Sequence, residues 1–225
     1  MTGSNAAALV AVAAVPLLAM MLSAFVKTSV VMSLLRNALG APQAPPDLLV
    51  TGLALLLTIF VMTPVARDVV AAIERPTVAP APAPGVPPPA PYHLDLDTPP
   101  PDGWLAAAER GAVPVRMFLA RHAHADDRAT FARVAGDLRG APVADDDLTV
   151  LSLAFVSSEL AEAFAIAFLV FLPFLLIDLV VGTTLGALGL NTVQPSTIAL
   201  PVKLLLFVAV DGWRLLFEGL LRGYA

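Results

Sequence analysis

The stretch Pro201-Val-Lys-Leu-Leu-Leu-Phe-Val-Ala-Val-Asp-Gly-Trp213 places a single lysine, Lys203, inside an apolar run that ends in Asp-Gly-Trp. An ammonium group surrounded by hydrocarbon is costly unless another group compensates its charge. The preceding apolar segment, 168–181, contains one charge as well, Asp178. Opposite charges within consecutive apolar helices predict a polar pair that holds these helices together inside the core of a membrane protein.

The spacing of these two residues supports a direct ion pair. We expect the turn between their helices near Leu190, so Asp178 and Lys203 lie at almost equal distances on either side of it. At about 1.5 Å per helical residue, both side chains reach nearly the same depth in an antiparallel hairpin. Two alternatives remain open: each charge meets a different subunit, or Lys203 extends its ammonium to the membrane surface.

Composition identifies the class of protein. Of the 225 residues, 58% are hydrophobic and only 14% are charged, with a mean hydropathy of +0.82. Soluble domains carry about 25% charged residues. The net charge of -5 gives no basic surface for nucleic acid, and the absence of cysteine excludes disulfides and cysteine metal sites. We therefore expect an all-α integral membrane protein.

Four apolar segments, 6–26, 48–66, 148–181 and 198–221, predict two hydrophobic helical hairpins, over residues 1–66 and 148–225. The first segment is interpreted as a retained helix, because no Lys or Arg precedes it as in a signal peptide. Lys27 and Arg36 in the joint 27–47 favour a cytoplasmic loop, which places residues 67–147 on the periplasmic side.

The region between the hairpins divides in two. Residues 67–103 are rich in proline and alanine, which predicts an extended tether without a core. Helical periodicity returns over 104–147, where Phe131, Val134 and Leu138 share one face, and Gly140 and Pro142 end the second helix. We expect a small helical extramembrane domain there.

Two further groups are candidate sites. Glu159 and Glu162 lie one turn apart and form either a polar face toward a pore or partner, or a solvated helix start. The turn at Leu190, Asn191 and Thr192 either lines a constriction or simply caps a turn.

Other patterns carry little chemistry. His122 and His124 are two residues apart, whereas helical zinc sites use a spacing of four. Gly182-Thr-Thr-Leu-Gly186 favours only close helix packing. We expect no catalytic residues, cofactor or metal. An alternative function is a small ion or solute channel, or a secondary transporter, that uses Asp178 and Lys203 within the membrane.

Four stretches together are similar to the FliP/SctR family, the R-type subunit of the type III secretion export apparatus. They are Met32-Ser-Leu-Leu-Arg-Asn-Ala-Leu-Gly40, Gly52-Leu-Ala-Leu-Leu-Leu-Thr58 through Pro64, Ala154-Phe-Val-Ser-Ser-Glu-Leu160 through Asp178, and Pro201 through Trp213. The resemblance implies a homo-oligomeric ring of about five copies, joined by two other small membrane subunits in the bacterial inner membrane. Such a ring is the entry portal for unfolded secreted proteins.

The sequence departs from the family pattern in two places. Ala161 stands where the family usually has a lysine after Ser-Glu-Leu, so any pairing through that lysine is absent. Leu190-Asn191-Thr192 stands where flagellar members carry a methionine triplet. The second departure favours an injectisome member over a flagellar one.

Overall fold

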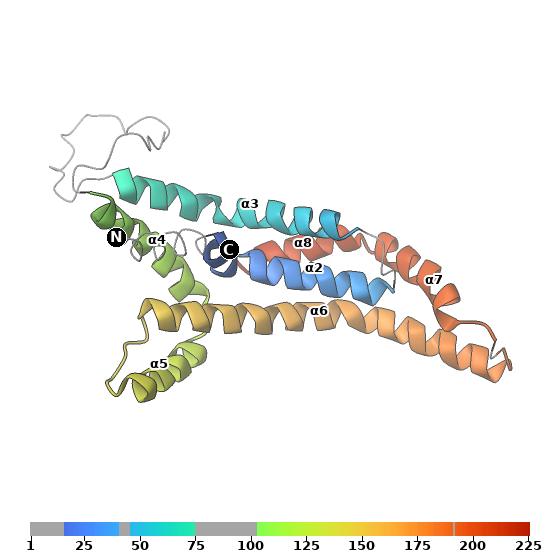
Figure 1. The fold of residues 1–225 in the computed structure, drawn as a ribbon. Helices are drawn as coiled ribbons and strands as arrows, with labels where there is room; N and C mark the ends of the chain where they lie inside the picture. Colours follow the sequence, from blue (N-terminus) through green and yellow to red (C-terminus); the bar gives the residue numbers. More distant parts are fainter. Residues whose placement is uncertain (1–15, 41–45, 75–102, 191) are drawn as a thin grey trace, which may run out of the picture. The chain divides into compact units, whose positions relative to one another are not determined.

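The computed structural model describes residues 16–40, 46–74, 103–190 and 192–225, and every regular element in these ranges is a helix (Figure 1). The main helices are α2 (Phe25–Leu39), α3 (Asp47–Glu74), α4 (Trp104–His122), α5 (Ala125–Arg139), α6 (Leu148–Ala187), α7 (Pro195–Ala209) and α8 (Gly212–Arg222). The expected all-α fold is therefore confirmed for the described residues. Most of the tether, 75–102, lies outside them.

These residues form two compact units. One combines Met1–Val61 with Val156–Ala225, and the other is Met62–Phe155. The beginning and the end of the chain thus share one core. The two expected hairpins are not independent bodies but pack together within this first unit.

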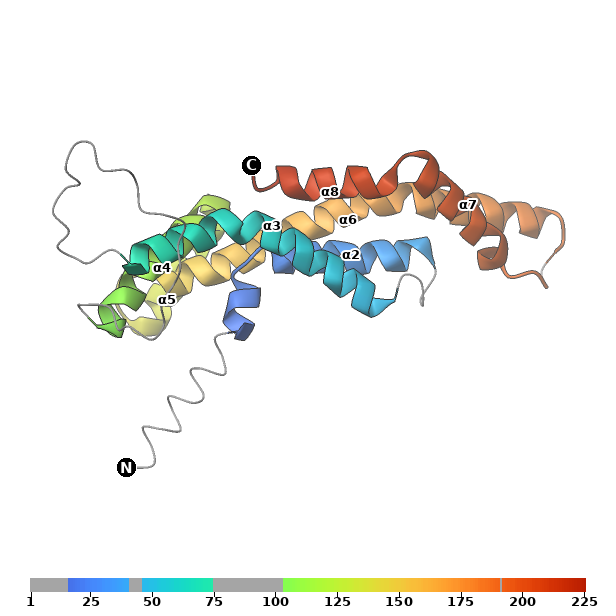
Figure 2. The same cartoon turned by 90° about the horizontal axis from the view of Figure 1, so that it is seen from above.

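Helix α2 provides the centre of the first unit. It contributes Val31, Met32, Leu35, Ala38 and Leu39 to the buried cluster, more than any other helix. The cluster is completed from α3, α6, α7 and α8, and α2 lies among these helices in Figure 1 and Figure 2. The expectation of a loop over 27–47 is wrong for most of that range, because the apolar face of α2 has a core to bury against.

The first apolar segment also differs from the single helix expected over 6–26. Residues 16–21 are helical, the chain turns at 22–24, and α2 begins at Phe25. The buried hydroxyl of Ser23 at this turn donates to the carbonyl of Met20. Residues 6–15 lie outside the described residues.

Among the residues that the structure describes, two helices are long and apolar enough to cross a membrane, Asp47–Glu74 with 28 residues and Leu148–Ala187 with 40. At about 1.5 Å per residue, α6 reaches roughly 60 Å, about twice the hydrocarbon thickness of a bilayer. Its start at Leu148 and its length agree with the continuous segment expected from the sequence.

The expected fourth helix, 198–221, is broken in two. Asp211 adopts a left-handed conformation with φ 53°, so α7 ends and α8 begins in a new direction (Figure 2). A Cβ atom added at Gly212 would lie 2.3 Å from the ring of Phe207, so the close approach of this ring requires glycine. Asp-Gly therefore encodes a bend that apolar periodicity alone does not reveal.

The second unit contains α4 and α5. Arg110 on α4 donates to the carbonyls of Ala72 and Ile73 at the end of α3, at 3.0 and 3.1 Å. These bonds satisfy carbonyls that a helix end leaves without partners. Helix α5 ends at Gly140 in a left-handed conformation, as the sequence predicts, but its apolar face remains uncovered at Leu138.

Candidate functional site

The first buried charge cluster joins three helices at the C-terminal end of α2. The Lys203 ammonium on α7 donates to Asp178 Oδ2 on α6 at 2.6 Å, and to the carbonyl of Ala38 on α2 at 3.1 Å. Lys203 is buried, so it does not extend to the surface, and the pair forms within one chain. The lysine also lies at the negative end of the α2 dipole, which favours a cation there.

Gly40 lies next to the Lys203 ammonium at the end of α2. It ends α2 with φ 72°, and a Cβ atom there would lie 3.6 Å from Lys203 Nζ. The left-handed conformation favours glycine, which has no Cβ atom. The positive φ therefore explains the glycine at this helix end, and a Cβ atom there would make only an ordinary contact with the lysine.

A second buried cluster lies at the opposite end of α2. The Lys27 ammonium is 3.1 Å from Glu159 Oε1 and 2.7 Å from Glu162 Oε2 on α6. It also faces the ring of Tyr224 at 4.1 Å from the ring centre, while the Tyr224 hydroxyl donates to Glu159. A lysine ammonium over an aromatic face gains a cation–π attraction as well.

The two carboxylates of this cluster differ in their exposure to solvent. Glu159 is 1% exposed, whereas the side chain of Glu162 is 35% exposed. Neither interpretation made from the sequence anticipated a lysine of the same chain as their partner. The idea of a solvated helix start is wrong for Glu159, which lies well inside α6 and is buried.

Sequence reasoning missed Lys27 as a site residue. Lys27 was interpreted as a loop residue whose positive charge favours the cytoplasmic side. In the structure its side chain is fully buried and belongs to α2. A signal was available: Lys27 follows an apolar stretch directly, as Lys203 is embedded in one. Such lysines require a buried partner, and the two glutamates on α6 supply it.

The two clusters fasten α2 to α6 at both ends. Lys27 lies in the first turn of α2 and Lys203 caps its C-terminal end, about 18 Å apart along a helix of this length. Between them, Thr28 bonds the carbonyls of Ala24 and Ala54 at 2.9 and 3.4 Å, which links α2 to α3. The arrangement can hold four helices in one register.

The turn after α6 contains the third candidate site. Leu190 and Thr192 are exposed, and the Leu190 amide donates to the carbonyl of Leu185 at 3.0 Å. Asn191 lies outside the described residues. Gly182 and Gly186 have open space around them, so no described segment of this chain uses their close-packing surface.

The histidines make local contacts. His122 Nδ1 lies 2.9 Å from the carbonyl of Phe118, and His124 lies 4.0 Å from Asp127. Within the described ranges, no group of three or more His, Asp or Glu side chains is placed to hold a metal ion.

Comparison with known proteins matches residues 8–220 to the FliP family. The chain belongs to the FliP family. It is 41% identical over 222 residues to the hypersensitivity response secretion protein HrcR of Ralstonia nicotianae, covering 96% of this chain and 94% of HrcR. It is 42% identical over 211 residues to the flagellar biosynthetic protein FliP of Pectobacterium carotovorum, covering 93% and 73%.

A third relative is the Yop proteins translocation protein R of Yersinia pestis, 39% identical over 220 residues and covering 93% of this chain and 90% of that protein. The matched range of this FliP-family chain includes Lys27, Glu159, Glu162, Asp178 and Lys203. All the charged residues of both buried clusters therefore lie inside the family's shared region, whereas Tyr224 lies just beyond it.

Proposed function

We propose that this chain is a core subunit of the type III protein secretion export gate. The observation that carries the proposal is the family match over residues 8–220, which spans both membrane-length helices and the charged residues of both buried clusters. The relatives are components of secretion, translocation and flagellar biosynthesis machinery. The role that we propose for this chain is to form a passage rather than to catalyse a reaction.

The buried clusters suit this role physically. A passage for polypeptide must keep its wall in one arrangement while a substrate moves through it. Hydrophobic packing alone permits several helix registers, whereas a buried ion pair penalises every register that separates its charges. We propose that the pairs at Lys27 and Lys203 set the register of α2, α6 and α7 for assembly.

We propose further that about five copies form a ring, with two other small membrane subunits, in the bacterial inner membrane. In this arrangement residues 67–147 lie on the periplasmic side. Because α3 continues to Glu74, the tether expected over 67–103 begins only after residue 74, and 104–147 form a small helical domain. Unfolded secreted proteins pass through the ring. The long apolar faces of α3 and α6 support an assembly of this kind.

In such a ring the turn at Leu190, Asn191 and Thr192 forms the constriction. Leu190 is the only large apolar residue of the three and is exposed, so it supplies most of the seal. Leu190→Gly should raise the permeability of the membrane to small solutes while the complex persists. Unchanged permeability in an intact complex would place the turn away from the passage.

We assign the chain to the injectisome branch of the family because Leu190-Asn191-Thr192 replaces the methionine triplet expected of flagellar members. Identities of 41% to HrcR and 42% to flagellar FliP do not separate the branches. Deletion of this gene in its host should abolish secretion of injectisome substrates and leave swimming motility intact.

The function is tested by purification of the tagged chain from its host in mild detergent. Native mass spectrometry should find a complex of several copies with two other small membrane proteins. A stable monomer or dimer, together with normal secretion after gene deletion, would overturn the proposal.

A further inference from the structure

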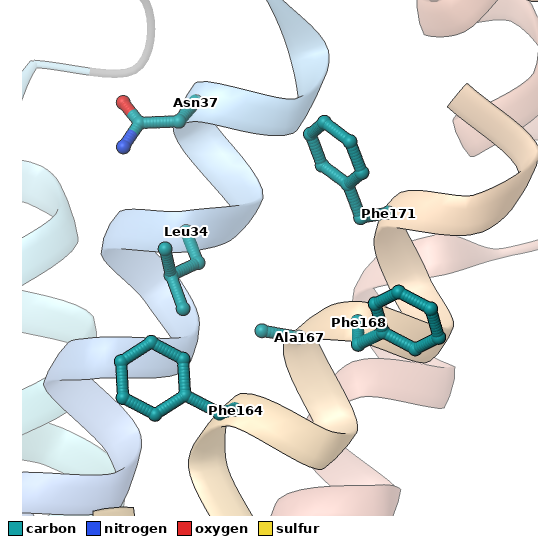
Figure 3. A pocket seen from close by; sticks show the side chains of 6 residues that line it. All are labelled: Leu34, Asn37, Phe164, Ala167, Phe168 and Phe171. Carbon is teal, nitrogen blue, oxygen red and sulfur yellow. The ribbon is translucent and has the colours of Figure 1, made fainter. Parts of the chain in front are cut away.

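A continuous row of large apolar side chains on α6 is left uncovered by the described part of the chain. The row, named here the α6 stripe, recurs at a 4-3-4 spacing that places its members on one helix face. Figure 3 shows its three phenylalanines standing out from α6 beside a hollow of 340 Å³ that Leu34 and Asn37 of α2 also line. The stripe consists of Phe164, Phe168, Phe171 and Leu175, all exposed.

Two polar groups on this face argue against lipid as its covering. Asp178 continues the stripe three residues after Leu175, and its side chain is 43% exposed although one oxygen is paired with Lys203. Asn37 is exposed beside the phenylalanines. A carboxylate or an amide turned toward hydrocarbon is expensive. Water is an equally poor neighbour for a long apolar row, which marks a protein contact instead.

The same compact unit carries a second uncovered row of different shape. The α3 stripe repeats the 4-3-4 spacing and contains a notch, because a Cβ atom built at Gly52 would meet nothing within 4 Å. Large apolar side chains stand on both sides of this notch and line a surface hollow with it. The α3 stripe consists of Leu48, Gly52, Leu55 and Ile59.

We propose that the α6 stripe of one copy packs into the α3 stripe of the next copy. Bulky phenylalanines on one helix fit a glycine notch on the other, and both rows have the heptad-like spacing of helices that pack at small crossing angles. The interface joins two different faces of one chain, so each copy uses both, and repetition of this contact builds a ring when the rotation per copy closes. This inference rests on the proposed assembly and names its contact surface.

The contacts within one chain set the register of this interface. Thr28 bonds the carbonyl of Ala54 on α3, and the adjacent Lys27 contacts Glu159 and Glu162 on α6. Because α2 runs in the same direction as α6, Thr28 and with it residue 54 of α3 lie level with about residue 162 of α6, whereas α3 runs in the opposite direction (Figure 1). A ring axis along the membrane normal preserves depth between copies, so Gly52 meets the level of Phe164 in the neighbouring copy.

Paired cysteines test this register, and the absence of native cysteine makes the background clean. The variant Gly52→Cys/Phe164→Cys should form a ladder of disulfide-linked copies in oxidised membranes. The matched control is Gly52→Cys/Ala165→Cys, whose second cysteine is exposed at the same depth but points away from the stripe. A disulfide requires Cβ atoms about 4 Å apart, so we expect about tenfold less crosslinking in the control.

Each outcome gives a separate answer. Equal or greater crosslinking in the control, or links between two Phe164→Cys copies alone, overturns the proposed pairing. An oligomer of the expected mass that yields no ladder overturns the interface but leaves the proposed function intact. A monomer by native mass spectrometry, again without a ladder, overturns both. Secretion by the reduced variant shows that the substitutions preserve the assembled protein.

Discussion

Replacement of Lys27 by methionine tests whether the buried cluster contributes more to stability than an ordinary surface ion pair does. Methionine retains most of the volume but removes the charge that lies 3.1 Å from Glu159 and 2.7 Å from Glu162. Glu159 is then a carboxylate with 1% exposure and no cation. Loss of one partner of a buried pair costs about 3–5 kcal/mol, which is roughly a 10²- to 10³·⁵-fold loss in the ratio of folded to unfolded protein.

A matched control and a second substitution make this prediction specific. Arg36→Met removes the partner of the exposed Asp47, which should cost at most about 1 kcal/mol. Adding Glu159→Gln to Lys27→Met should recover at least half of the loss, because the glutamine side chain carries no charge and Tyr224 can still donate to the new amide oxygen. Glu162 remains partly solvated.

The assay is SDS-induced unfolding of the detergent-solubilised complex, together with the amount of chain that accumulates in the membrane. We expect the order of stability to be wild type, Arg36→Met, the double variant and then Lys27→Met. Equal stability of Lys27→Met and Arg36→Met would show that the cluster does not hold the helices together. A double variant less stable than Lys27→Met would show that the unpaired, buried carboxylate of Glu159 is not the cause of the loss of stability.

Three further predictions concern other parts of the fold. Asp178→Ala or Lys203→Ala should lower accumulation of the complex and secretion, and the charge swap Asp178→Lys/Lys203→Asp should restore part of both; wild-type secretion in both single variants would contradict this. Gly212→Ala should cost about 1–3 kcal/mol in the same unfolding assay, because its methyl group overlaps an aromatic ring of α7. The pKa of Asp147 is lowered chiefly by a backbone amide in the first turn of α6. The stabilisation of this helix end by the Asp147 carboxylate is therefore complete above the unfolded pKa of about 3.9. It is lost as the pH falls through the lower folded pKa. The protection of amides in that turn against hydrogen exchange, measured relative to the intrinsic exchange rate at each pH, should fall over this range, and Asp147→Asn should remove this change in protection.

Apolar patterning predicted the two membrane-length helices, because a hydrophobic run of that length has few other stable conformations in a chain with 14% charged residues. It did not predict α2 or the bend at Asp211. Helix α2 has charges and small polar residues, and only its burial among other helices explains why it is helical. The bend depends on one backbone conformation and on the ring that packs over Gly212.

For the candidate site, the sequence alone determined that Asp178 and Lys203 reach equal depth, because a helical hairpin converts residue number directly into position. It also determined that buried charges exist and need partners. Only the tertiary structure decided that Lys27 meets Glu159 and Glu162, because those residues are more than 130 positions apart along the chain and no local period relates them. Such a pairing depends on how the first and last parts of the chain pack into one core.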